Sequence, residues 1–302
     1  MSPPPKPSGV IVPLITPITP AHQLDFDALD RLIEFQIASG VQGVLLLGTT
    51  GEGPSVPQAL RRPLVERAVD TAQKRLRIYV NITELSLEDA LASIRDFFAV
   101  GADAIAALPP FYFPPQPVEL TAWFRALLDA SPGPVLLYNI PLTTRVSIPL
   151  EVVGELIGHP RLCGLKDSEN DVQRHAELFR CFGGRADFSI FLGVGALMEH
   201  GLKLGADGIV PSVGNLIPGE CRRQVEAARR QDWGAVHASA ARQATVAALY
   251  QQSRTLAQSL AVLKALIHLR GLCSPWGFPP LLPVPAEELE ALREQLSKLD
   301  LV

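Results

Sequence analysis

Short apolar runs alternate with stretches of helical periodicity along most of the chain. The runs are bounded by glycine, proline or polar residues, a pattern typical of buried strands. Eight such strand–helix units predict an α/β fold, a parallel sheet closed into a (β/α)8 TIM barrel. The strand runs lie at residues 9–16, 43–47, 77–81, 104–108, 134–138, 162–166, 188–192 and 208–211.

The segments before and after these units differ in character. Residues 1–8 are proline-rich and lack an apolar signal core, so we expect a flexible N-terminal tail. Residues 9–231 hold the barrel. Residues 232–302 are nearly all helical in pattern and too long to be the eighth helix alone. We expect them to form a C-terminal helical region that packs on the barrel or on a neighbouring subunit.

Composition and charge narrow the range of partners. Lys and Arg number 27 against 31 Asp and Glu, a net charge of -4 without long runs of one sign, so we expect neither nucleic acid nor a membrane as partner. The four cysteines form no CxxC pair and the six histidines show no metal-ligand spacing, which argues against a disulfide framework and a metal site. No run approaches the roughly 18 apolar residues of a membrane helix. We therefore expect a cytoplasmic protein that uses no metal.

The run at residues 162–166 ends in a lysine, Lys166, which is a candidate nucleophile. An amine between an apolar interior and an opening is more readily neutral, and a neutral amine can attack a carbonyl carbon to form a Schiff base. Most lysines at strand ends reach into water instead. The assignment therefore depends on the neighbouring residues.

Two further polar features fall at the same end of the predicted barrel, where barrel active sites lie. Tyr138 ends the run at residues 134–138, and Thr49 and Thr50 follow the run at 43–47 beside Gly48. A tyrosine hydroxyl can shuttle protons, and threonine hydroxyls with glycine-supported amides can hold a carboxylate. The tyrosine could instead serve packing, and the glycine-rich loop could be a tight turn. That loop lacks the lysine of the common phosphate-binding pattern.

Three motifs resemble those of a known family, the dihydrodipicolinate synthase and N-acetylneuraminate lyase family of class I aldolases. The likeness extends from residue 9 to residue 215. It implies a (β/α)8 barrel with a C-terminal helical region, a homotetramer built as a dimer of dimers, and no metal or organic cofactor. The motifs are Gly48-Thr49-Thr50-Gly51-Glu52-Gly53, Tyr138-Asn139-Ile140-Pro141 and Gly164-Leu165-Lys166-Asp167-Ser168.

The resemblance also implies roles for single residues. Lys166 would form the imine with pyruvate or another 2-oxo acid, and Tyr138 would relay protons. Thr49 and Thr50, with Gly48, would hold the carboxylate and the tyrosine. Tyr112 matches the family tyrosine that reaches into a neighbouring subunit's site, although its ring could instead pack under its own proline-rich loop. Glu52 is expected to brace its loop, and Asp167 to be structural.

The sequence departs from the best-known members of this family at two places. Dihydrodipicolinate synthases carry an arginine five residues after the tyrosine, where this chain has Thr143; Arg145 replaces it only if the loop bends differently. Sialic acid lyases carry an acidic pair after the glycine that follows strand seven, where this chain has Val194-Gly195-Ala196 after Gly193. The Lys-Asp-Ser form resembles members that act on 2-keto-3-deoxy sugar acids or 4-hydroxy-2-oxoglutarate.

Ser168, Gly193 and Ser212 are the remaining candidates for binding substrate. Ser168 could hold a hydroxyl of the aldehyde portion or could be a helix N-cap. The leading hypothesis is a lyase that reversibly cleaves a small 2-oxo acid to pyruvate and an aldehyde. Its rivals are a synthase that condenses pyruvate with aspartate semialdehyde, a barrel that binds phosphate near strands seven and eight, and a non-catalytic sensor of 2-oxo acids.

Overall fold

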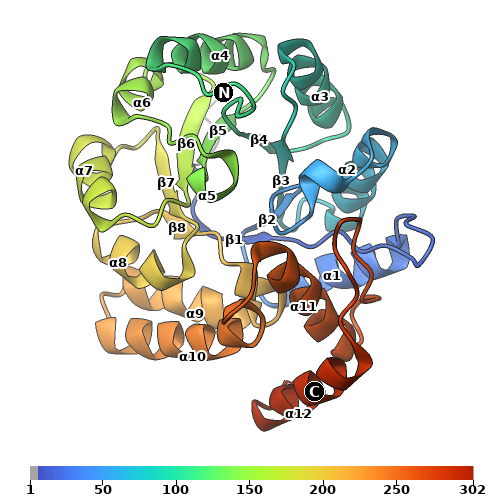
Figure 1. The fold of residues 1–302 in the computed structure, drawn as a ribbon. Coiled ribbons are helices and arrows are strands. Elements are labelled where there is room, and N and C mark those ends of the chain that lie inside the picture. The colour runs from blue at the N-terminus through green and yellow to red at the C-terminus, as the bar shows by residue number, and fades with distance from the viewer. Residues whose placement is uncertain (1–5, 302) are drawn as a thin grey trace.

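The computed structural model describes residues 6–301 and contains a closed barrel of eight parallel strands (Figure 1). The strands pair in sequence order, and β1 closes the barrel on β8 through the pairs Gly9↔Gly208 and Val10↔Ile209. The predicted fold class is confirmed. The strands are β1 (Gly9–Pro13), β2 (Gly43–Leu46), β3 (Arg77–Ile82), β4 (Ala104–Ala107), β5 (Val135–Asn139), β6 (Leu162–Asp167), β7 (Ser189–Leu192) and β8 (Gly208–Ile209).

Helices surround the barrel as an outer ring (Figure 1). The short helix α5 (Pro141–Thr144) lies apart from this ring, close to the mouth formed by the carboxyl ends of the strands. Three 3-10 turns, η1 (Gly53–Ser55), η2 (Gly195–Leu197) and η3 (Ser212–Asn215), follow β2, β7 and β8. The ring consists of α1 (Phe26–Ala38), α2 (Gln58–Ala72), α3 (Leu87–Ala99), α4 (Pro117–Ala130), α6 (Leu150–Leu156), α7 (Val172–Phe182), α8 (Met198–Lys203) and α9 (Pro218–Arg229).

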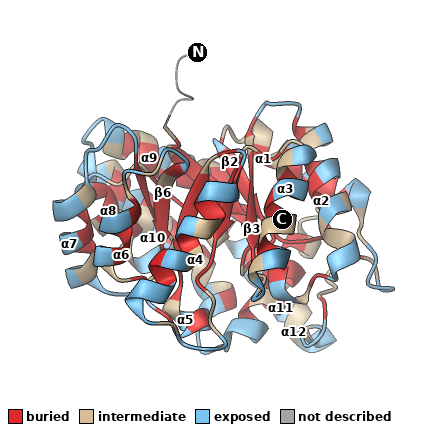
Figure 2. Cartoon of the chain, turned by 90° about the horizontal axis from the view of Figure 1, so that it is seen from above, coloured by how far each residue is buried: buried red, intermediate tan, exposed pale blue. Residues whose placement is uncertain are grey.

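Local sequence signals explain where several helices begin. The Asp25 carboxylate accepts a hydrogen bond from the backbone N–H of Ala28 at 3.0 Å, and the Ser86 hydroxyl accepts one from Asp89 at 3.4 Å. Both are N-caps that satisfy donors left free at a helix start. Buried residues cover the strands and the inner faces of the helices (Figure 2). A smaller apolar cluster fills the barrel itself and includes Tyr138.

The C-terminal region packs on the barrel of its own chain. It consists of α10 (Trp233–Gln251), α11 (Leu256–Leu269) and α12 (Ala286–Lys298). Helix α10 lies along α9, and α11 lies at the same end of the barrel as α5 (Figures 1 and 2). The Ser274 hydroxyl donates to the Ile18 carbonyl at 3.0 Å, which ties this region to the loop after β1. Across residues 6–301, no helix has the length and apolarity that crossing a bilayer demands.

Part of the expected N-terminal tail can be followed. Residues 1–5 lie outside the described residues. Lys6 forms an ion pair with Asp207 at 2.7 Å, and the Ser189 hydroxyl donates to the Pro7 carbonyl at 2.7 Å. Lys6 and Pro7 therefore lie against the amino-terminal ends of β7 and β8.

Candidate active site

Lys166 and Tyr138 lie side by side on neighbouring strands. The two residues are register partners on β6 and β5, so both side chains point to the same face, into the barrel. The Lys166 amine lies 3.6 Å from the centroid of the Tyr138 ring. The two side chains are only 5% and 2% exposed. The Lys166 amine is thus held against an aromatic face with little contact to water.

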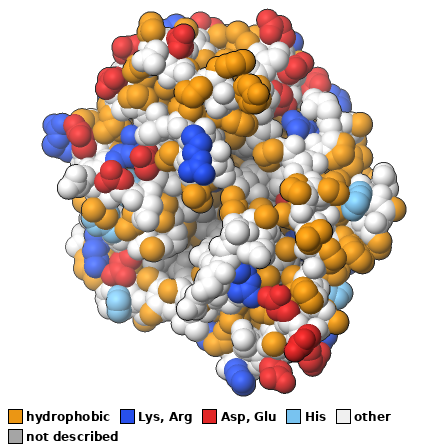
Figure 3. Space-filling model, viewed as in Figure 1, with side chains coloured by type: hydrophobic (Ala, Val, Ile, Leu, Met, Phe, Trp, Pro, Cys, Tyr) orange, Lys and Arg blue, Asp and Glu red, His pale blue; other side chains and the backbone are white. Residues whose placement is uncertain are grey.

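Thr49 continues this arrangement. Its hydroxyl lies 3.3 Å from the Tyr138 hydroxyl, within hydrogen-bonding distance. Thr50, the next residue, is buried. The structure therefore brings Lys166, Tyr138 and Thr49 together, as the sequence predicted, at the carboxyl ends of three strands. In Figure 3 the surface is hollowed near its centre, on the face where this mouth lies.

The loop after β2 has a conformation that few sequences allow. The Gly53 N–H donates to the Gly48 carbonyl at 3.1 Å, and the Glu52 N–H donates to the Thr49 carbonyl at 3.1 Å. A side chain at Gly53 would place its Cβ 1.8 Å from the Leu47 carbonyl oxygen, so only glycine fits there. This tight turn presents Thr49 to the tyrosine.

Ser168 and Gly193 border the lysine. A Cβ atom on Gly193 would lie 3.2 Å from Lys166 Cε and 2.0 Å from Ser168 Oγ, so the glycine backbone is the neighbour of both side chains. The N-cap of α7 is Asp171, whose carboxylate accepts from two backbone N–H groups. The interpretation of Ser168 as the helix N-cap is therefore wrong, and its hydroxyl lies beside the lysine instead.

Ser212 lies on η3, after β8. Its hydroxyl forms a hydrogen bond of 2.8 Å with the Tyr250 hydroxyl, and the Gln251 amide donates to it at 3.4 Å. Burial raises the pKa of Tyr250 well above its ordinary value. Its phenol is therefore neutral at physiological pH. The C-terminal region thus contributes polar groups next to a predicted substrate-binding residue.

Asp167 follows the lysine and is fully buried in a polar network beneath it. Its carboxylate accepts from Arg174 Nε at 2.8 Å and from the Asn139 amide at 3.2 Å. Burial alone would raise the pKa of this carboxyl. The His175 ring, 3.6 Å away, and the Arg174 guanidinium together lower the pKa by more than burial raises it, so the net shift is downward. The charged network fixes the end of β6 and so orients Lys166, in keeping with the structural role expected for Asp167.

Tyr112 and Arg145 are both exposed, and neither is joined to Lys166, Tyr138 or Thr49 by a contact among the described residues. Tyr112 is 73% exposed and meets the Phe113 ring edge to face at 5.1 Å between centroids. Arg145 is exposed and ends α5 in a left-handed conformation. Thr143 is also exposed, and its hydroxyl donates to the carbonyl of Ile140, the N-cap of its own helix, at 3.3 Å. Within this chain, neither Tyr112 nor Thr143 is brought to the lysine by a contact among the described residues.

The sequence interpretation missed two contributions from the C-terminal region, Tyr250 and Lys264. Lys264 lies in the apolar run 261–267 and is 1% exposed. A single lysine inside such a run signals a buried anionic partner, and Glu52 is that partner. Tyr250 carries no comparable signal, because a tyrosine near a helix end is common in packed cores.

The fold and this cluster define a class of protein, a (β/α)8-barrel enzyme with a buried lysine beside a tyrosine at the mouth. The chain belongs to the dihydrodipicolinate synthetase family, whose model matches residues 6–299. It is 34% identical over 215 residues to a 4-hydroxy-tetrahydrodipicolinate synthase of Sorangium cellulosum, covering 70% of this chain and 71% of that relative. It is 32% identical over 221 residues to the synthase of Protochlamydia amoebophila, covering 73% and 74%.

The chain is also similar to a solved structure of a dihydrodipicolinate synthase. The dihydrodipicolinate synthase of Bacteroides thetaiotaomicron superposes with a TM-score of 0.91 at 30% identity, covering 96% of this chain and 98% of that one. The protein is therefore an enzyme of this family, and the family resemblance seen in the sequence is confirmed.

Proposed function

We propose that this protein is a Schiff-base-forming lyase that reversibly converts a small 2-oxo acid to pyruvate and an aldehyde. The observation that carries the proposal is the contact of the buried Lys166 amine with the Tyr138 ring, whose hydroxyl reaches Thr49. A nucleophile, a proton carrier and a hydroxyl that orients the carrier are the three parts such a reaction needs.

The steps follow from these groups. The Lys166 amine attacks C2 of the 2-oxo acid, and the carbinolamine loses water to give an iminium. The carbinolamine hydroxyl departs as water with the proton of the Tyr138 phenol, and the phenolate, which the Thr49 hydroxyl contacts at 3.3 Å, then takes the proton of the C4 hydroxyl. The C3–C4 bond breaks, its electron pair enters the iminium to give an enamine, and the aldehyde departs. Protonation of the enamine at C3 and hydrolysis of the imine release pyruvate and restore the free amine.

The carboxylate of the 2-oxo acid is assigned to Thr50 and to the amides of the Gly48–Thr49 turn. These are uncharged donors grouped around one loop. Ser168 and Gly193 border the carbon chain on the other side of the lysine. No cofactor enters these steps.

The proposed assembly is a homotetramer, a dimer of dimers, in which Tyr112 completes the proton relay of a neighbouring copy. Its 73% exposure in the single chain suits a residue that another copy covers. Mixing a Lys166→Ala chain with a Tyr112→Phe chain tests this. Activity above that of either parent supports a shared site, and activity no higher than the parents contradicts it.

The proposed substrate is a 2-keto-3-deoxy acid or a 4-hydroxy-2-oxoglutarate type of compound. The alternative is 4-hydroxy-tetrahydrodipicolinate synthase activity on aspartate semialdehyde, which the names of the relatives favour. Thr143 weighs against the alternative, because a hydroxyl does not replace a bidentate arginine on a carboxylate. Pyruvate release from a panel of 2-keto-3-deoxy acids, measured beside condensation of pyruvate with aspartate semialdehyde, decides between them.

A further inference from the structure

Asn81 is a buried amide on the inner face of the barrel. It lies on β3 two residues after Tyr79, and side chains two residues apart on a strand point to the same side. Tyr79 belongs to the apolar cluster that fills the barrel, so Asn81 also points inward. The Asn81 side chain is only 2% exposed. An amide thus faces the barrel interior close to the carboxyl end of its strand.

The strand pairing places Asn81 at the level of Tyr138. In a barrel of this kind the pairing falls back by roughly eight residues per turn, so a level layer advances by about one residue from each strand to the next. Asn81 pairs with Ala106 on β4, and the next residue, Ala107, pairs with Leu137 on β5. One residue further along β5 is Tyr138. Asn81 and Tyr138 therefore point into the same layer, from β3 and β5.

The Asn81 side chain also contacts the start of the turn that presents Thr49. Its Nδ2 donates to the Leu47 carbonyl at 3.2 Å, two residues before Thr49. A carbonyl oxygen only accepts, so the amide nitrogen of Asn81 faces Leu47 and its Oδ1 points away from it. Asn81 is thus linked to Thr49 through the turn and to Tyr138 through the shared layer.

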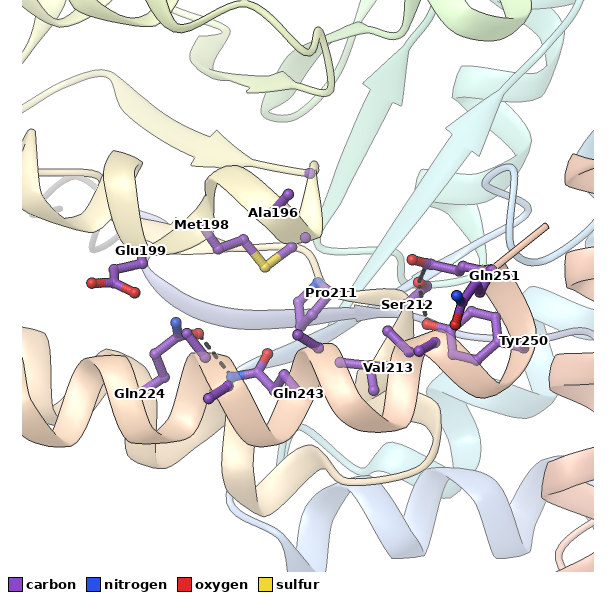
Figure 4. A pocket seen from close by; sticks show the side chains of 18 of the residues that line it. Ala196, Met198, Glu199, Pro211, Ser212, Val213, Gln224, Gln243, Tyr250 and Gln251 are labelled. Carbon is purple, nitrogen blue, oxygen red and sulfur yellow. Dashed lines mark hydrogen bonds between the residues drawn. The ribbon is translucent and has the colours of Figure 1, made fainter. Parts of the chain in front are cut away.

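No hydrogen-bond donor among the described residues reaches Oδ1 of Asn81. The buried amide of Gln243 shows the usual arrangement. Its Nε2 donates to Gln224 Oε1 at 2.8 Å (Figure 4), and its Oε1 accepts from Cys221 Sγ at 3.3 Å. A buried carbonyl without a donor costs free energy. Such an acceptor in the layer of the proton carrier indicates a donor that arrives with the reaction.

Water is the donor that the proposed reaction brings to this layer. It leaves when the carbinolamine becomes an iminium, and it attacks C2 when the imine of pyruvate is hydrolysed. Lys166 and Tyr138 are only 5% and 2% exposed, so bulk water does not surround C2. An attacking water directs a lone pair at the carbon, which leaves its two hydrogens to be held by acceptors. The Tyr138 phenolate takes one, and the second acceptor has to come from elsewhere in the protein.

We propose that Asn81 is a positioning residue whose Oδ1 holds the water of imine hydrolysis. The water oxygen bonds to C2, and the C=N π pair moves to the Lys166 nitrogen. One proton of the water goes to the Tyr138 phenolate, while the other O–H stays hydrogen-bonded to Asn81. The inference rests on the proposed lyase function.

The carbinolamine then collapses. The C–N bond breaks, C2 regains its carbonyl, and the hydroxyl proton passes to the nitrogen, which gives pyruvate and the free amine. The same contacts serve in reverse when the imine forms. The loss of Asn81 Oδ1 should therefore slow hydrolysis relative to proton exchange at C3, which involves no water attack.

Deuterium exchange into pyruvate measures this ratio. In D2O the iminium loses a C3 proton to the Tyr138 phenolate and the enamine regains a deuteron, and this repeats until hydrolysis releases the molecule. We expect Asn81→Leu to slow hydrolysis roughly tenfold, the effect of one hydrogen bond. The share of pyruvate with two or three deuterons at low conversion, measured by mass spectrometry, should then exceed that of the wild type severalfold. An unchanged share overturns the proposal.

Two further variants at this position separate a lost acceptor from a disturbed fold. Asn81→Asp keeps an acceptor oxygen whether its carboxyl is ionised or protonated, so it should return the share of multiply deuterated pyruvate to near the wild-type value. A share as high as in Asn81→Leu contradicts the role of the acceptor. Asn81→Ala introduces no larger side chain and should raise the share in the same direction as Asn81→Leu, so it provides the measurement if the leucine variant does not fold.

Two controls lie outside this position. Lys264→Met removes the ion pair with Glu52 on the same loop and should slow exchange without raising the share, because C3 exchange and hydrolysis both depend on Tyr138. Gln243→Leu removes a buried amide elsewhere and should keep the wild-type share. A rise in either control equal to that in Asn81→Leu contradicts the assignment to Asn81.

Borohydride trapping of pyruvate on Lys166 distinguishes failure of this inference from failure of the lyase function. If the wild type is trapped and Asn81→Leu gives the wild-type deuterium pattern, only the role of Asn81 is rejected. If the wild type neither traps nor exchanges pyruvate, the lyase function is rejected and the role of Asn81 with it.

Discussion

Glu52 and Lys264 form an ion pair that joins the loop beside the lysine site to the C-terminal helix α11. Both side chains are almost fully buried, at 3% and 1% exposure. The Glu52 carboxylate also accepts from the Phe278 N–H at 2.7 Å, and the Lys264 ammonium donates to the Trp276 carbonyl at 2.7 Å. Burial lowers the pKa of Lys264, while the charge of Glu52 opposes that shift. The C-terminal region therefore holds the turn that presents Thr49 to Tyr138.

Replacing Lys264 by Met tests whether the ion pair with Glu52 holds the turn in place. Removing one partner leaves a buried carboxylate unpaired, so we expect the free energy of unfolding to fall by roughly 3 kcal/mol. The turn that positions Thr49 also loses its ion pair to α11, so we expect kcat to fall on the order of tenfold to a hundredfold. Chemical denaturation and steady-state kinetics measure the two effects.

Two controls accompany the Lys264 variant. Lys203 forms an ion pair with Glu199 but is half exposed, so Lys203→Met should change stability by less than about 1 kcal/mol. The double variant Glu52→Gln with Lys264→Met should be more stable than the sum of the single changes predicts, because no buried charge is left alone. Strict additivity would show that the pair does not act as a unit.

The Thr49–Tyr138 contact should govern turnover more than binding. Tyr138→Phe removes the proton carrier and should lower kcat by about 10²- to 10⁴-fold. Thr49→Val keeps the shape and removes the hydroxyl, so we expect a smaller loss, roughly tenfold, with KM for pyruvate little changed. Thr49→Ser should restore most of kcat. A Thr49→Ser variant as slow as Thr49→Val would contradict a role for the hydroxyl.

Gly53 is the position of the turn where a side chain is least tolerated. Gly53→Ala forces a Cβ against the backbone carbonyl of Leu47, which cannot rotate away as a side chain could. We expect a loss of more than roughly 3 kcal/mol in the free energy of unfolding. Gly158→Ala is the matched control, because a Cβ there meets nothing within 4 Å, and it should lie within about 0.5 kcal/mol of wild type.

Asp167 should make stability depend on acid pH. Its folded-state pKa is lowered, so its contribution is complete at neutral pH, declines as the pH approaches the ordinary value of 3.8, and is lost once the pH falls through the folded-state pKa. Asp167→Asn should cost roughly 3 kcal/mol at pH 7, because the buried Arg174 loses its main partner. The gap between variant and wild type should narrow as the pH falls below 3.8.

Urea denaturation at several pH values measures this dependence. Asp96→Asn changes an exposed carboxylate and should stay within about 0.5 kcal/mol of wild type at each pH. A gap between Asp167→Asn and wild type that stays constant down to pH 3 would show that the Asp167 charge does not contribute.

The periodicity of the sequence was sufficient to predict the barrel. The run at residues 104–108 corresponds to β4, Ala104–Ala107, and the run at 134–138 to β5, Val135–Asn139. Buried parallel strands are apolar along their whole length, so each forms a distinct run between helices. The proximity of Lys166, Tyr138 and Thr49 could also be predicted, because residues at the carboxyl ends of barrel strands all lie at the same rim.

The rest depends on contacts between distant parts of the chain. The pairing of Glu52 with Lys264 and of Ser212 with Tyr250 is decided by how α10 and α11 pack on the barrel, which local patterns do not encode. Ser168 suits a helix N-cap by residue type, but the chain continues to Asp171 before α7 begins, because that carboxylate reaches two N–H groups. Both Ser168 and Asp171 are residue types that suit an N-cap, and the structure shows that α7 begins after Asp171.

The most direct measurement is mass spectrometry of the protein after incubation with pyruvate and borohydride. We expect one stable adduct of reduced pyruvate per chain, located on Lys166, and no adduct on a folded Lys166→Ala variant. An unmodified wild-type chain, or an adduct on another lysine such as Lys203 in place of Lys166, would contradict it.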